Sequence, residues 1–293
     1  MVNFVKNGAL NTRLFRKLCS EMNAEHLNLL YYTRVRWLSK GNVLARVFEL
    51  REELKEFLNR QGKYELESCF RNSTFIAKLA YLVDIFHQLN RLNLKLQRRD
   101  TTILDFIDAL NAFVQKLENW NRKAKEGNFA MFETLSSVIE GNVDVDLSSE
   151  ILQHLVNLRK EFLTYFPEIS AVDLELVRKP FAIPVEKVAD DLQDELIDFR
   201  NDTTCKDNFE TLSICEFWAR ACVSYPRIGK ECIKVLLPFS STYLCEAGFS
   251  TLVQMKTKAR NRLGVENGMR CALSSTPPKI DVLVNEVQQQ VSH

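Results

Sequence analysis

Cysteine and histidine, the side chains best suited to metal binding and nucleophilic chemistry, are scattered in this sequence. None of the four histidines stands beside a cysteine at zinc-finger spacing: they are His26, His87, His154 and His293. The eight cysteines include no C-x-x-C pair, and Cys215 and Cys222 fall within apolar helical patterns. Neither a glycine-rich phosphate loop nor a G-x-S-x-G motif is present. We therefore expect reduced, buried thiols, no metal site and no cofactor.

A basic run near the C-terminus is the one segment that suggests phosphate binding. Its cations are Lys256, Lys258, Arg260 and Arg262. The chain as a whole has 39 basic and 38 acidic residues, a formal charge of +1, so no global field attracts nucleic acid. No aromatic residue is interleaved with the cations for base stacking. The run predicts a solvated turn, with local nucleic-acid contact as the alternative.

Amphipathic helices are the main elements expected to position these side chains. Apolar residues repeat at helical spacing over residues 43–58, 74–98, 103–120 and 148–166. Thr102 stands three residues before Asp105, a capping-box pattern that opens the third of these segments. Residues 31–37, rich in β-branched and aromatic side chains, predict a strand or extended stretch, with a turn at residues 39–42. The predicted fold class is therefore mainly α.

Length and composition indicate a folded protein. The 293 residues suit one large domain or two closely packed ones, and 46% hydrophobic with 26% charged residues is typical of globular proteins. A spanning helix needs about 20 consecutive apolar residues. The best run, residues 233–239, is much shorter and contains Lys234. We expect a soluble protein of the nucleus or cytoplasm, with no membrane contact.

Two longer segments resemble a known family. They are residues 33–51, with TRVRWLSKG and RVFELR, and residues 236–274, with LLPFSSTYLCEAGFS, KTKARNRL and RCALS. Both are similar to the hAT transposase superfamily, in particular the Buster-like and BED-finger-associated proteins domesticated from it. The resemblance implies a truncated ribonuclease-H-like segment at 1–41, a helical insertion domain packed on it at 42–204, and a C-terminal dimerisation region at 205–293.

The resemblance also implies a lost active site. Glu246 matches the third acidic residue of the family, and Trp37 matches a tryptophan near the active-site hairpin. Strand transfer of this class needs two divalent metals held by acidic ligands, and the other two ligands lie upstream of that tryptophan. Here no aspartate precedes Asp84, and only Glu21 and Glu25 precede Trp37. We expect no enzyme activity, Glu246 as a relic and Trp37 as a packing residue.

The predicted function is therefore association. Loss of upstream strands would leave sheet edges that a partner can cover. The partner expected is a second copy or a related transposase-derived protein, and the family suggests the nucleus. The aromatic-rich stretch 217–249 supplies the candidate dimerisation residues, which are Trp218, Tyr225, Leu237, Phe239, Tyr243 and Phe249. The same residues are equally suited to a core, and a mixture of both roles is expected. The alternative function is a residual nucleic-acid binder that uses the basic turn 256–262.

Overall fold

The protein is helical throughout the described residues of the computed structural model, which are 1–31, 37–97, 101–139, 143–166, 171–238, 243–257, 264–274 and 279. The first helices are α1 (Val2–Lys6), α2 (Ala9–Glu21), α3 (Trp37–Glu49), α4 (Arg51–Arg60), α5 (Tyr64–Arg71), α6 (Ser73–Leu96), α7 (Ile103–Lys125) and α8 (Glu133–Ser136). They are followed by α9 (Val145–Tyr165), α10 (Ala171–Arg178), the 3-10 helix η1 (Val185–Lys187), α11 (Asp190–Asn201), α12 (Thr203–Thr211), α13 (Ile214–Ser224), α14 (Pro226–Leu236), α15 (Tyr243–Met255) and α16 (Glu266–Leu273). The prediction of a mainly helical fold is confirmed.

The first apolar cluster, here called the N-terminal cluster, joins α1 to α5 with the start of α6. Phe15 of α2 meets Phe57 of α4 edge to face, with ring centroids 5.4 Å apart. Leu54 and Leu58, one helical turn apart on α4, are both fully buried. This is the spacing expected for the inward face of an amphipathic helix, as the sequence predicts for residues 43–58.

Helix α3 differs from the sequence-based prediction at its start. A turn was predicted at residues 39–42, but the helix runs through them from Trp37. A methyl group added at Gly41 would lie 2.8 Å from Asn90 Nδ2 and 3.0 Å from Phe86 Cβ, both on α6. The glycine therefore serves close packing of two helices rather than a turn. Residues 32–36, the centre of the predicted extended stretch, lie outside the described part of the chain.

The second cluster, the central cluster, is formed by α6, α7, α8 and α9. The predicted capping box of α7 is present, because the backbone N–H of Asp105 donates to Thr102 Oγ1 at 3.2 Å while that of Thr102 donates to the Asp105 carboxylate at 3.0 Å. The carboxylate of Asp84 on α6 accepts from the backbone N–H groups of Thr134 and Leu135, at 3.1 and 2.9 Å. These caps satisfy donors that helix starts leave open and fix α8 against α6.

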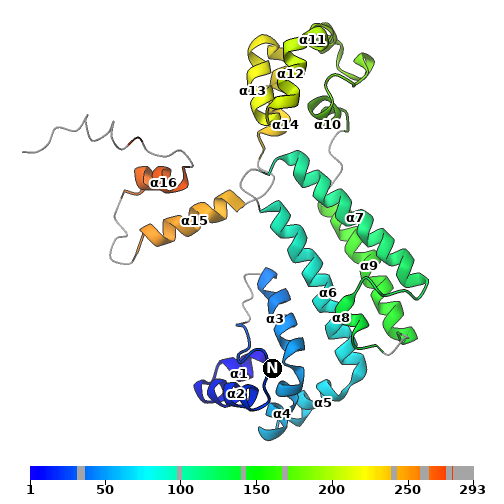
Figure 1. Ribbon diagram of the computed structural model, residues 1–293, viewed down its shortest axis with the longest axis vertical. Coiled ribbons are helices and arrows are strands. Elements are labelled where there is room, and N and C mark those ends of the chain that lie inside the picture. Colours follow the sequence, from blue (N-terminus) through cyan, green and yellow to red (C-terminus); the bar gives the residue numbers. More distant parts are fainter. Residues whose placement is uncertain are drawn as a thin grey trace, which may run out of the picture.

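The third cluster, the upper cluster, gathers α10 to α14 around the first turn of α7. Figure 1 shows the helices of the three clusters in succession, with α6 to α9 between α1–α5 at one end and α10–α14 at the other. Helices α6 and α7 each contribute to two clusters: Leu79 and Ile85 of α6 belong to different ones, as do Leu104 and Leu110 of α7. Because each of these helices is a continuous rigid element, it fixes the position of one cluster relative to the next.

None of the described side chains of α15 and α16 belongs to the three clusters. Figure 1 shows these two helices apart from the rest, and each makes its main contact with the other. No strand occurs in the described segments, so a ribonuclease-H-like remnant is not seen at 1–41, where α1, α2 and the start of α3 lie. The predicted boundaries at 41 and 204 fall inside α3 and α12. Across the described residues, no helix combines the length and apolar character needed to cross a membrane.

Candidate interaction surface

Two of the predicted dimerisation residues lie in the upper cluster. Trp218 is fully buried on α13, stacks on Phe199 with centroids 5.6 Å apart, and donates from Nε1 to the carbonyl of Val177 at 3.1 Å. Its indole has both its apolar surface and its polar group satisfied within one chain. Trp218 therefore presents no surface to a partner while the cluster is intact.

Tyr225, at the junction of α13 and α14, is half-buried and tied to the cluster by a hydrogen bond. Its hydroxyl donates to the Asp202 carboxylate at 3.0 Å. Burial, with this carboxylate nearby, raises the pKa of Tyr225 to about 12. The pKa of Asp202 is lowered, first by the backbone N–H of Cys205 and then by the Tyr225 hydroxyl. Asp202 thus caps α12 and anchors the α13–α14 corner at once.

The other predicted dimerisation residues fall near α15. Leu237, just after α14, is 71% exposed, and Phe249 on α15 is 68% exposed. Tyr243 is the first residue of α15, but its side chain lies outside the described set, and Phe239 lies outside the described residues altogether. Of the six, the structure therefore places two in a core and two at the surface.

Phe249 belongs to a longer exposed stripe on α15. Val253, one turn further on, is 71% exposed, and Cys245, one turn before, is also exposed. Residues four apart share one face of a helix, so these three side chains form a continuous surface, here called the α15 stripe. Of the predicted dimerisation residues, only Phe249 belongs to this stripe. The i, i+4, i+8 spacing of Cys245, Phe249 and Val253 in the sequence is the signal that could have identified the other two.

Helix α16 packs on a different face of α15. A methyl group added at Gly268 would lie 3.5 Å from Met255 Sδ, and one added at Gly248 would lie 3.9 Å from Leu273 Cδ1. The early part of α15 thus meets the end of α16, and the end of α15 meets its start, which makes the pair an antiparallel hairpin. The hairpin covers part of α15 and leaves the α15 stripe open.

Glu246, the predicted catalytic relic, lies in the first turn of α15 and is exposed. Among the described residues, no group of three or more histidine, cysteine, aspartate or glutamate side chains converges closely enough to hold a metal ion. Trp37 opens α3, and its side chain is outside the described set. The absence of enzyme activity stays a prediction.

The predicted basic turn is only partly described. Lys256 follows α15 and is exposed, whereas Lys258, Arg260 and Arg262 lie outside the described residues. Nothing in the structure places these four cations on one surface, so nucleic-acid contact at the turn also stays a prediction.

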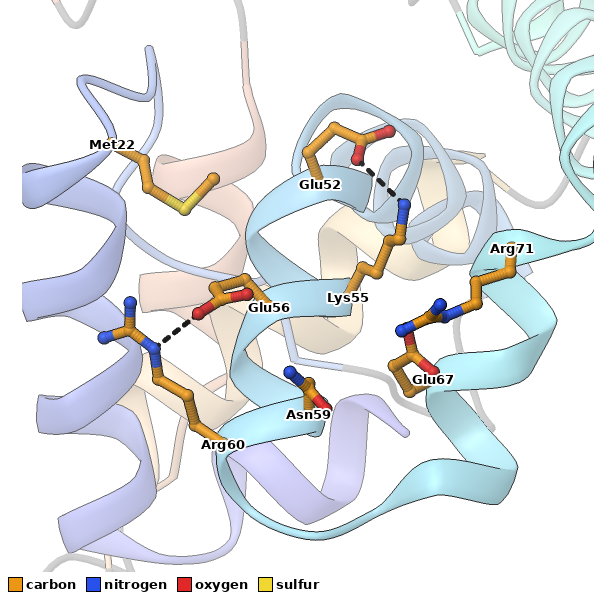
Figure 2. A pocket seen from close by; sticks show the side chains of 8 residues that line it. All are labelled: Met22, Glu52, Lys55, Glu56, Asn59, Arg60, Glu67 and Arg71. Atoms are coloured by element: carbon orange, nitrogen blue, oxygen red, sulfur yellow. Dashed lines mark hydrogen bonds and ion pairs between the residues drawn. The ribbon is translucent and has the colours of Figure 1, made fainter.

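A polar cleft of about 380 Å³ lies between α2, α4 and α5. Figure 2 shows its charged side chains in opposite pairs: Lys55 lies 3.7 Å from Glu52, Arg60 lies 2.7 Å from Glu56, and Arg71 contacts the buried Glu67. Three cations and three carboxylates neutralise one another at this cleft. It therefore offers no net charge to an ionic ligand, and we regard it as structural.

Comparison with known proteins places the N-terminal part of the chain most clearly. Residues 1–125, which contain α1 to α7, match the FAM200/GTF2IRD2 helical domain. The chain is also 34% identical over 264 residues to General transcription factor II-I repeat domain-containing protein 2 of Bos taurus, an alignment that covers 89% of this chain and 27% of the relative. The chain thus spans about a quarter of the length of that relative.

These matches correct the predicted family. The sequence was assigned to Buster-like hAT transposases, but the domain that matches is that of the FAM200/GTF2IRD2 group. The motif at 33–51 lies inside the matched residues and, from residue 37, forms helices α3 and the start of α4, so it is part of a helical domain rather than of a catalytic sheet. Similarity to this group fits a domesticated, transposon-derived protein.

Proposed function

We propose that this chain is a non-catalytic, transposase-derived interaction protein that associates with a second copy, or with a related protein, through the α15 stripe. The observation that carries the proposal is the exposure of Phe249 and Val253 on a helix that lies outside the three clusters. Apolar side chains gathered on one exposed face mark interaction sites more often than isolated ones do.

The chemistry of the stripe suits an interface. A phenylalanine that becomes fully buried contributes about 1.5–3 kcal/mol through apolar burial alone. Aromatic anchors of this kind dominate the energy of many interfaces. A surface that pairs with its own copy must be self-complementary about a two-fold axis, and a single straight helix stripe meets that condition simply. Leu237, exposed at the end of α14, offers a second apolar contact on the path to α15.

The nucleus is the proposed location, since the name of the relative above refers to a repeat domain of a general transcription factor. The relative is nearly four times as long as the segment that aligns with this chain. We therefore do not assign any of its partners to this chain. The alternative function, a residual nucleic-acid binder at residues 256–262, would use the exposed Lys256 beside the stripe.

Light scattering on the purified chain at tens of micromolar, a concentration at which weak interfaces form, tests the proposal. The wild-type chain is expected at twice the mass of one chain, and Phe249→Glu with Val253→Glu at the mass of one. The matched control is Val145→Glu with Val223→Glu, because both valines are more than 80% exposed on helices of the clusters. A monomeric wild-type chain, or dissociation of the control as well, would refute self-association through this stripe.

A further inference from the structure

A shallow groove between α6 and α7 carries three cations. Arg91 and Lys95 of α6 lie along one side, and Lys116 of α7 lies on the other, with Gln88 at one end of the α6 row. All three cations are exposed. The groove belongs to none of the sites discussed above and is distant in sequence from the basic turn.

The three cations have no acidic partner in the described part of the chain, whereas Arg71 and Lys78, for example, are each paired with a carboxylate. Within the described residues, no carboxylate lies within 4.0 Å of Arg91, Lys95 or Lys116. The groove on the other side of α7, between α7 and α9, is the useful contrast. There Arg122 pairs with Glu126 at 3.1 Å and Arg159 with Glu118 at 2.8 Å. Lys125 and Lys160 also line that groove, and it keeps part of its positive charge. The α6–α7 groove differs in that its lining contains no carboxylate at all.

The shape of the groove limits what can bind. Its floor is closed by Leu92 and Phe113, which are only 8% and 5% exposed, and its volume is about 30 Å³. That is room for little more than a water-sized group. An acidic protein segment generally needs a pocket for an apolar anchor to bind well, and none is offered. The groove suits a ligand that supplies closely spaced charge without a side chain to bury.

We propose that the α6–α7 groove binds the phosphate backbone of a nucleic acid. Arg91 and Lys95 are one helical turn apart, a rise of about 6 Å, and duplex DNA presents a phosphate about every 3.4 Å along each strand. A strand that lies along α6 thus meets both cations, with Lys116 on its far side. Gln88 adds a hydrogen-bond donor of the kind that contacts phosphate oxygens. Because all four polar side chains of the groove are assigned to phosphate contacts, which carry no sequence information, binding is expected to be independent of sequence.

Fluorescence anisotropy of the full chain with a labelled duplex of about 20 base pairs, over a range of salt from roughly 50 to 200 mM, tests this proposal. The triple variant Arg91→Gln, Lys95→Gln, Lys116→Gln is expected to lower the slope of log K against log salt by about 2 to 3, since each phosphate contact contributes about 0.9. Affinity at the lowest salt should fall at least about tenfold.

The control variant Arg13→Gln, Lys17→Gln, Lys206→Gln removes the same charge from exposed positions elsewhere and should leave the slope unchanged. Several results would overturn the proposal: no DNA bound by the wild-type chain at the lowest salt, equal losses in both variants, or no loss in the triple variant. Competition by polyglutamate as effective as that by unlabelled duplex, at equal charge, would assign the groove to acidic proteins instead.

Discussion

Helices α13 and α15 both come from the aromatic-rich last third of the chain, yet their aromatic side chains differ in exposure. Trp218 on α13 is fully buried, while Phe249 on α15 is 68% exposed. The difference is one of neighbours: α13 packs against α14 and belongs to a cluster with α10 to α12, whereas the main contact of α15 is with α16. The contrast shows that an aromatic side chain stabilises the fold in one region and is available for association in the other.

Truncating the two aromatic side chains should give the largest contrast. Trp218→Ala removes a buried indole and its hydrogen bond to Val177, and should lower the free energy of unfolding by about 3–5 kcal/mol. Phe249→Ala should change it by less than about 0.5 kcal/mol in the monomer. Urea denaturation at low protein concentration measures both. Equal losses would mean that α15 belongs to the folded core.

Adding a methyl group to a glycine in each region should give the next largest contrast. A Cβ at Gly229 of α14 would lie 2.5 Å from Cys222 Cα on α13, so Gly229→Ala must push two helices apart and should cost about 1–3 kcal/mol. Gly264, between α15 and α16, has nothing within 4 Å of such an atom. Gly264→Ala should therefore leave the thermal midpoint nearly unchanged. A tolerant Gly229 would show that α13 and α14 are less tightly packed than described.

Loss of one hydroxyl should give a smaller effect at the α13–α14 corner. Tyr225→Phe removes the hydrogen bond to Asp202 and should cost about 1 kcal/mol, the usual net contribution of such a bond. The same change at Tyr31, which is 65% exposed and has no hydrogen bond to its hydroxyl among the described residues, should have no measurable effect. The denaturation midpoints of the two variants are compared with that of the wild type at one pH. An unchanged midpoint for Tyr225→Phe would contradict the role of this hydrogen bond.

The smallest effect expected is the pH dependence of Asp202. Its pKa is lowered in the folded state, so its ionised form contributes stability above the unfolded value of about 3.9. That contribution is lost as pH falls through the lower folded pKa. The stability difference between wild type and Asp202→Asn should therefore be larger at pH 7 than at pH 3. A difference that stays constant over this range would contradict the role given to Asp202.

Local patterns explain why much of the fold was predictable. Apolar spacing and the Thr102–Asp105 capping box identified α7, and the amphipathic pattern of residues 43–58 identified most of α3 and α4. These features depend on neighbours in the sequence. The turn predicted at residues 39–42 failed because Gly41 is explained by a tertiary contact with α6, which no local pattern reveals.

The candidate surface was less predictable for a related reason. Trp218, Tyr225 and Phe249 are similar in sequence context, and their burial depends on which helices pack around them. The charged groove between α6 and α7 was missed altogether, since Arg91 and Lys116 come together only when two helices pair. The net charge of the whole chain, which is +1, does not reveal a local excess of positive charge of this kind.

Hydrogen–deuterium exchange of the full chain at low and high protein concentration tests the central claim most directly. If α15 is the association element, its backbone amides should exchange quickly in dilute protein and slow down as concentration rises, while the amides of α13 stay protected at both. Protection of α15 that is the same at every concentration, or that rises only together with that of α13, would contradict the division of the molecule into a folded body and an associating hairpin.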